Sequence, residues 1–155
     1  MSAVLIGVGN LYRRDDGIGP AVAEVIEGLG LPGVSVLISD GEPSRLLEAW
    51  SGARLAVVVD ATRRDGGVAG TIERHCVTDG PLTGGWTSSG SASTHGLGIG
   101  EAIHLAQAMN EMPERLVVFA VEAADIGYGE HLSLPVSASL PELTQAVLSE
   151  LEQHC

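Results

Sequence analysis

The sequence predicts an α/β fold, a three-layer α/β/α sandwich around a twisted, mostly parallel five-stranded sheet. Two observations predict this class. Short aliphatic runs alternate with stretches of helical periodicity, and the most apolar runs are continuous rather than alternating in polarity. Continuous aliphatic runs are typical of parallel strands that helices cover on both faces. The 155 residues suffice for one such unit, and we expect a single domain over residues 1–155.

Five runs are expected to form the strands of this sheet. The first, third and fifth are the most apolar, which indicates that they lie in the interior of the sheet. The fourth run alternates in polarity and contains Arg74 and His75, so we expect a half-exposed edge strand. In chain order the predicted strands are Ala3–Val8, Val34–Ile38, Leu55–Asp60, Gly70–Val77 and Leu116–Val121.

Four helices are predicted between and after these strands. Apolar residues recur at helical spacing in the stretch that follows Gly17, within Ser44–Trp50 and within Thr94–Met109. The last helix carries a capping-box pattern, Ser139-x-x-Glu142, which predicts that this helix begins at Ser139.

The composition excludes several classes of protein. The chain has 20 acidic and 8 basic residues and a net charge of −12, and all of its basic residues are arginine. A protein that binds nucleic acid needs a basic face, which this sequence does not provide. The N-terminal residues do not resemble a signal peptide, and no apolar run approaches the roughly 20 residues of a membrane span. With two cysteines and no CxxC pair, we expect a cytoplasmic protein that binds neither nucleic acid nor membranes.

The segment after the first strand contains two consecutive aspartates, Asp15 and Asp16, before the first helix. It does not fit a dinucleotide-binding fingerprint, because Tyr12 stands where the third glycine belongs and two carboxylates would repel a pyrophosphate. One aspartate is enough to cap the helix. The pair therefore has two open interpretations, plain capping or a functional role for the second carboxylate.

Two further polar residues lie at junctions between strands and helices. Asp60 directly follows five apolar residues, where the carboxyl ends of parallel strands form the sites of open α/β sheets. His95 precedes the third predicted helix, where a neutral imidazole can bind a metal or accept a proton. Two carboxylates and an imidazole suit a divalent metal ion, so Asp16, Asp60 and His95 are candidate ligands. A turn aspartate and a surface histidine are the alternatives.

A nucleophile is the other open possibility for this region. The segment Pro81–Thr94 is rich in serine, and we expect a mobile loop there. It contains no Gly-x-Ser-x-Gly motif. Neither Cys76 nor Cys155 has the surroundings of an activated thiolate.

Several of these segments resemble the motifs of one known family, the [NiFe]-hydrogenase maturation endopeptidases. The opening Val4–Pro20, with its GxGN and DDGxG elements, is the most specific match, and the resemblance covers almost the whole chain. It implies an enzyme that removes the C-terminal extension of a hydrogenase large-subunit precursor after nickel insertion. The other matching segments are Ser39–Leu47, Val57–Ala61, Ser93–Gly98, Val121–Glu122 and Leu132–Val136.

This resemblance assigns roles to particular residues. It implies that Asp16, Asp60 and His95 are both the catalytic residues and the metal ligands, and that Asp40 and Gly41 bind substrate. The first of these positions is glutamate in some members and aspartate here. The metal is nickel, which the precursor supplies and the enzyme does not hold permanently, and we expect a monomer. The alternatives are a non-catalytic nickel-checking chaperone on the same fold and, with less support, a nucleotide-binding protein.

Overall fold

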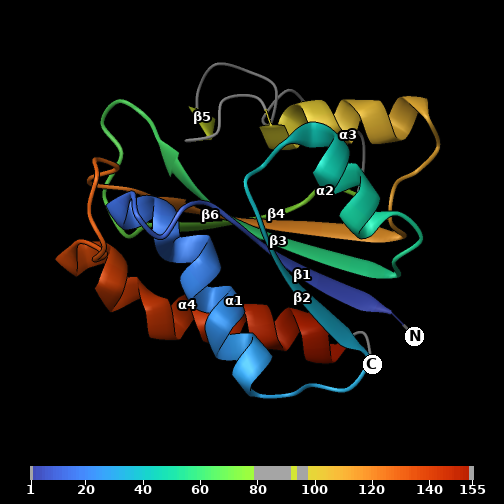
Figure 1. The fold of residues 1–155 in the computed structure, drawn as a ribbon, viewed down its shortest axis with the longest axis horizontal. Coiled ribbons are helices and arrows are strands. Elements are labelled where there is room, and N and C mark those ends of the chain that lie inside the picture. The colour runs from blue at the N-terminus through green and yellow to red at the C-terminus, as the bar shows by residue number, and fades with distance from the viewer. Residues whose placement is uncertain (1, 79–91, 94–97, 154–155) are drawn as a thin grey trace.

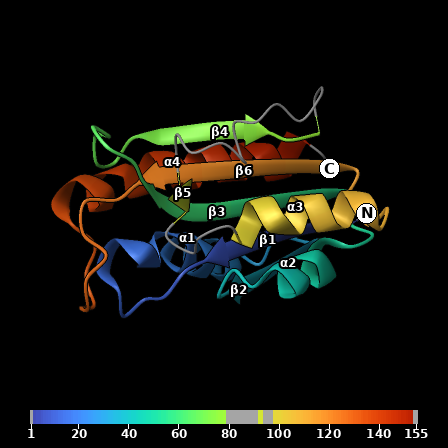
Figure 2. The same cartoon turned by 90° about the horizontal axis from the view of Figure 1, so that it is seen from above.

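The computed structural model describes residues 2–78, 92–93 and 98–153. Its central sheet has the strand order β2-β1-β3-β6-β4. Helices α2 and α3 cover one face of this sheet and helices α1 and α4 cover the other (Figure 1). Seen from the side of α2 and α3, the strands run from β4 at one edge to β2 at the other (Figure 2). The predicted three-layer α/β/α sandwich is confirmed.

Apart from shifts of one or two residues at the ends of β2, β4 and β6, the strands differ from the predicted runs in two places. β3 is longer than predicted, so Asp60 lies within this strand and pairs with Ala120 of β6. A short strand, β5, was not predicted and pairs with the end of β3. β4 is a half-exposed edge strand, as predicted. The strands are β1 (Ala3–Val8), β2 (Val34–Ser39), β3 (Leu55–Arg63), β4 (Ile72–Cys76), β5 (Ala92–Ser93) and β6 (Arg115–Glu122).

The pairing explains why the sheet is mostly parallel. β1 pairs in parallel with both β2 and β3, and β3 pairs in parallel with β6. The antiparallel partners are β4, on β6, and the short β5, on β3. The carboxyl ends of β1, β2, β3 and β6 therefore meet at one edge of the sheet, which is where a site is expected in this class of fold.

To within one residue, the helices lie within the predicted segments, of which residues 94–97 fall outside the described ranges, and they show one clear difference at the C-terminus. The capping-box prediction is wrong, because α4 begins at Leu134 and Ser139 lies inside it, with its hydroxyl donating to the Val136 carbonyl. The buried stripe on α4 begins at Val136, so tertiary packing extends the helix upstream of Ser139. The helical elements are η1 (Arg14–Gly17), α1 (Ile18–Gly28), α2 (Pro43–Trp50), α3 (Gly98–Ala108) and α4 (Leu134–Gln153). Within the described ranges, none of these helices is long and apolar enough to cross a membrane.

The two faces of the sheet have separate cores. On β3, Val57, Val59 and Ala61 pack with α1 and α4, whereas Ala56 and Val58 pack with α2 and α3. Because successive side chains of a strand point to opposite faces, Asp60 belongs to the face that α2 and α3 cover. The register of β3 thus decides which side of the sheet carries this carboxylate.

Glycines at the start of the chain allow the first helix to approach the strand ends. A Cβ atom at Gly19 would lie 2.6 Å from the carbonyl oxygens of both Val8 and Val59. A Cβ atom at Gly9 would overlap the carbonyl oxygen of Asp16, so η1 also lies directly on the end of β1. These glycines serve close backbone packing, and that packing places η1, which carries Asp16, on the end of β1 and in contact with β3.

Candidate active site

Asp16 is held in place by the loop that follows β1. Its side chain is 1% exposed. The Asn10 N–H donates to the Asp16 Oδ2 at 3.1 Å and to the Asp16 carbonyl oxygen at 3.2 Å. The same N–H therefore fixes both the backbone and the carboxylate of this residue.

Asp60 is fixed within β3. Its side chain is also 1% exposed, and the Ala61 N–H donates to its Oδ1 at 2.8 Å. The start of α1 packs against the Val59 carbonyl, and η1 contacts β3. The structure thus brings the two elements that carry Asp16 and Asp60 together at the carboxyl end of the parallel strands. Buried carboxylates cost free energy unless hydrogen bonds, an ion pair or a metal compensates for the lost water.

His95, the third predicted ligand, lies outside the described residues. The residues nearest to it that the structure describes are Ser93 and Gly98. Ser93 of β5 pairs with Thr62, two positions after Asp60, and Gly98 begins α3. Among residues 2–78, 92–93 and 98–153, no cluster of three or more His, Cys, Asp or Glu side chains forms a metal site. The three-residue metal site stays a prediction. The structure describes two of its three proposed ligands, Asp16 and Asp60.

The serine-rich segment also falls mostly outside the described ranges. Of Pro81–Thr94, the structure describes Ala92 and Ser93, which form β5. The expected loop is thus interrupted by a strand pair at these two residues, and the rest of that expectation stays untested. Cys155 lies outside the described residues as well.

Asp15 forms a set of hydrogen bonds different from the bonds between Asp16 and Asn10. It is fully buried, and its Oδ2 accepts the N–H groups of Ala124 and Asp125 at 2.8 and 2.9 Å. Ser133 donates its N–H to Oδ1 at 2.7 Å and its hydroxyl to Oδ2 at 2.8 Å. Neither η1 nor α1 has a side-chain cap. The capping interpretation is wrong for this pair, because Asp15 instead ties the segment between β6 and α4 to the site.

The two predicted substrate-binding residues lie in the loop between β2 and α2. Asp40 is exposed, accepts the Glu42 N–H at 3.1 Å and forms an ion pair with Arg45. Gly41 is buried with a φ of 87°, and a Cβ atom at Gly98 would overlap its carbonyl oxygen. Gly41 therefore has a packing role against the start of α3, and substrate binding by Asp40 and Gly41 stays a prediction.

The hydrogen bonds that Asp40 accepts predict a lowered pKa for its carboxyl group. The Glu42 N–H, and then the hydrogen bond from Arg45, lower the pKa of Asp40 below its ordinary value of 3.8. Since the folded pKa is the lower one, the stability that Asp40 contributes is present above the unfolded pKa and is lost as the pH falls through the folded pKa. An NMR titration of the side-chain carboxyl carbons should show this depressed pKa.

The same titration of Arg45→Gln tests the cause. The pKa of Asp40 should rise but stay below 3.8, because the Glu42 N–H, the larger cause, is retained. A pKa of Asp40 that does not change in Arg45→Gln would show that the ion pair is absent in solution.

Glu122 is a buried carboxylate that reasoning from the residues missed. It ends β6, is 4% exposed, and accepts the Arg64 N–H at 2.9 Å. The Arg64 guanidinium lies 3.4 Å away, and a Cβ atom at Gly67 would overlap the carboxylate. Glu122 thus holds the connection between β3 and β4. Glu122 directly follows an apolar run, as Asp60 does, and this signal could have identified it. Only the family resemblance included Glu122.

Comparison with known proteins identifies the class of fold. No protein-family model matches the sequence, and no curated protein sequence matches it. Solved structures do match, and those named hydrogenase maturation proteases cover nearly the whole chain. At sequence identities below 25%, this likeness establishes the fold alone, which is that of hydrogenase maturation proteases.

Three of these structures show how closely the fold agrees. The chain matches an endopeptidase from Escherichia coli with a TM-score of 0.83 and 23% identity, covering 99% of this chain and 94% of that one. It matches the hydrogenase maturating endopeptidase HybD from E. coli at 0.79 and 19%, covering 99% and 94%. It also matches the [NiFe] hydrogenase maturation protease HybD from Thermococcus kodakarensis at 0.76 and 20%, covering 96% and 98%.

Proposed function

We propose that this protein is an endopeptidase that removes the C-terminal extension of a [NiFe]-hydrogenase large-subunit precursor after nickel insertion. The observation that carries the proposal is the pair of buried carboxylates, Asp16 and Asp60, on adjoining elements at the carboxyl edge of the sheet. The solved structures that share this fold are named maturation proteases, and the motif segments of the sequence resemble that family.

In this proposal the nickel belongs to the substrate. Asp16, Asp60 and His95 complete the coordination of an ion that the precursor brings, and the protein holds no permanent metal. Carboxylate oxygens and an imidazole suit a divalent ion. A backbone N–H that donates to one oxygen orients each described carboxylate, so these ligands are fixed before the precursor arrives.

The residues of the chain then act by positioning the precursor. Asp16 and Asp60 hold the precursor's nickel at the edge of the sheet. Asp40 and Gly41 contact the part of the precursor that surrounds the nickel. The nickel supplies a Lewis acid that polarises the scissile carbonyl or a water molecule. Specificity comes from the metal together with the fold of the precursor, so a precursor without nickel is not cut. We expect the reaction in the cytoplasm, with a monomeric enzyme.

The decisive experiment compares two forms of one precursor. The purified protein is incubated with the nickel-loaded large-subunit precursor encoded in the same genome and with its nickel-free form, and intact masses are measured. We expect loss of a C-terminal peptide from the nickel-loaded form only. Binding without cleavage would favour a nickel-checking chaperone. Cleavage of both forms would remove nickel from the mechanism and favour the serine-rich segment as the source of a nucleophile.

A further inference from the structure

The edge strand β2 lacks the features that usually protect a sheet edge. Its sequence, VSVLIS, contains no charged residue and no proline. Leu37 and Ile38 are 43% and 51% exposed. Natural edge strands are commonly protected by charges, prolines or bulges, because an open edge offers hydrogen bonds to another chain.

The backbone of β2 also has donors and acceptors that point outward. The Ala3 N–H donates to the Gly33 carbonyl and the Gly9 N–H to the Ser39 carbonyl, so the odd-numbered residues of β2 face β1. In a parallel ladder the intervening residues, Val36 and Ile38, direct their N–H and C=O groups away from β1. In the part of the chain that the structure describes, no other strand pairs with this side of β2.

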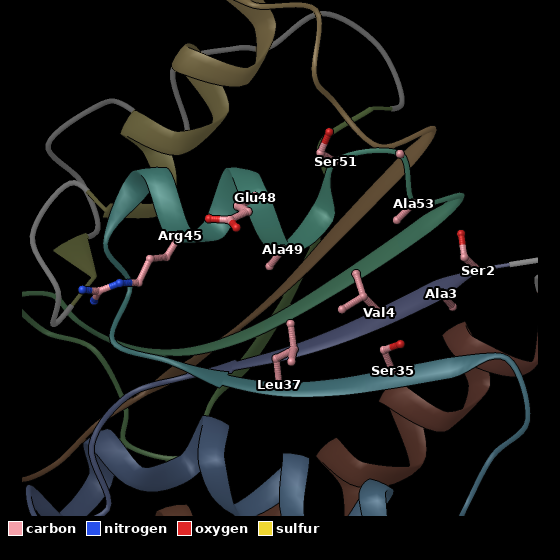
Figure 3. A pocket seen from close by; sticks show the side chains of 11 residues that line it. Ser2, Ala3, Val4, Ser35, Leu37, Arg45, Glu48, Ala49, Ser51 and Ala53 are labelled. Carbon is pink, nitrogen blue, oxygen red and sulfur yellow. The ribbon is translucent and has the colours of Figure 1, made fainter.

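Each face of this strand is bordered by a cavity that is open to solvent. On the α2 side, a cavity of about 540 Å³ lies between α2 and the strands β1 and β2, and Leu37 and Val4 point into it from the sheet, facing Ala49 (Figure 3). A second cavity of about 380 Å³ shares Leu37 and Ala49 and continues to Asp40. On the α1 side, Val34 and Val36 line a cavity of about 190 Å³.

These cavities fit the side chains of an added strand. Successive side chains of such a strand would alternate between the α2 side and the α1 side. β2 has six residues, which corresponds to about 20 Å of extended chain. The cavity that ends at Asp40 leads to the edge of the sheet where Asp16 and Asp60 lie, so a segment bound on β2 would approach the candidate site.

Charge decides between the possible occupants. Each of the three cavities is lined by one carboxylate, from Glu48, Asp40 and Glu27 in turn. The guanidinium of Arg45 is already paired with Asp40. Two copies of this chain, each with a net charge of −12, would bring these carboxylates together if they paired through β2. A segment that is apolar and uncharged or basic meets no such repulsion.

We propose that β2 is a docking edge, on which an extended, apolar segment of the precursor adds as an extra strand with its side chains in the flanking cavities. The inference rests on the proposed function and concerns recognition rather than cleavage. Strand addition takes its affinity from backbone hydrogen bonds and its specificity from pockets for alternate side chains. Val36 and Ile38 supply the backbone groups, and Leu37 and Ala49 line the pocket.

The first test is hydrogen–deuterium exchange of the wild-type protein with and without the nickel-loaded precursor. Binding should slow exchange in the peptide that contains residues 34–39, because the outward N–H groups become hydrogen-bonded. If the precursor is cleaved but exchange in residues 34–39 does not change, the inference is overturned and the proposed function stands. If residues 34–39 are protected but nothing is cleaved, the inference stands and the function fails.

The second test replaces Ile38 by proline. Ile38→Pro removes one outward N–H and keeps the hydrogen bonds of β2 to β1, and proline is tolerated on strand edges that face solvent. We expect the KM for the precursor to rise about five- to tenfold with kcat unchanged. The matched variant Ile38→Val keeps the outward N–H and the β-branched shape, so its KM should rise less than that of Ile38→Pro.

The same variants test whether a second copy of this chain, rather than the precursor, binds to β2. Sedimentation equilibrium of the wild-type protein should show a monomer. A wild-type dimer that dissociates in Ile38→Pro would overturn the inference in favour of pairing between two β2 strands. Equal KM values for Ile38→Pro and Ile38→Val would also overturn it.

Discussion

The variants Asp16→Asn and Asp60→Asn should each stop processing of the nickel-loaded precursor while the protein stays folded. An amide oxygen can still accept the Asn10 N–H or the Ala61 N–H, so both local hydrogen bonds survive the change. What each variant loses is a negative charge at the position proposed to receive the nickel. Since loss of even an outer partner of a metal ligand costs about 10- to 100-fold, we expect the cleavage rate to fall by about 10²-fold or more, measured as the fraction of precursor shortened with time by intact mass.

A matched control separates the loss of this charge from the loss of any buried carboxylate. Glu122→Gln removes a buried negative charge from the end of the neighbouring strand β6, where Glu122 holds Arg64. We expect Glu122→Gln to lower the melting temperature and to keep cleavage activity. If Asp16→Asn and Asp60→Asn process the precursor at the wild-type rate, the assignment of the active site is wrong.

The variant Asp15→Ala should have a large effect on stability, whereas Asp16→Asn and Asp60→Asn are expected to stay folded and to lose processing. It leaves the N–H groups of Ala124, Asp125 and Ser133 without the carboxylate that they share. The three hydrogen bonds are partly buried. A donor left without its partner costs about 1–3 kcal/mol when it is buried, so we expect the free energy of unfolding to fall by about 3 kcal/mol in total. For a chain of 155 residues this corresponds to a melting temperature lower by roughly 6–12 °C.

Urea and thermal unfolding measure this effect. The control is Asp65→Asn, since Asp65 is an exposed aspartate in the connection between β3 and β4, and its stability should stay within about 0.5 kcal/mol of the wild type. A melting temperature of Asp15→Ala equal to that of Asp65→Asn would show that the segment between β6 and α4 is not held through this carboxylate.

The predicted fold was correct because its signals are local. Continuous aliphatic runs identified the parallel strands, and alternation of polarity identified the edge strand β4. The errors came from long-range contacts. α4 extends upstream of its capping-box pattern because Val136 packs into the core. β5 exists because it pairs with β3, far from it in sequence.

The candidate site divides in the same way. An apolar run that ends in a charge identified Asp60 from the residues alone, and the same signal was available for Glu122. For Asp15 and Asp16 the sequence left the roles open, since the sequence alone does not show the surroundings of two adjacent carboxylates. Their burial in different surroundings separates them, because Asp15 accepts four hydrogen bonds from the segment between β6 and α4.

The sequence by itself determined the α/β class, the identity of the main strands and the candidate carboxylates, because hydrophobic periodicity and residue chemistry are properties of neighbouring residues. Only the tertiary structure decided which aspartate stabilises the fold and that Gly19 lets α1 approach β3. It also decided that Asp60 belongs to the face covered by α2 and α3 and that the apolar strand β2 lies at an edge. These features depend on which distant backbone groups meet, and packing and strand register alone specify that.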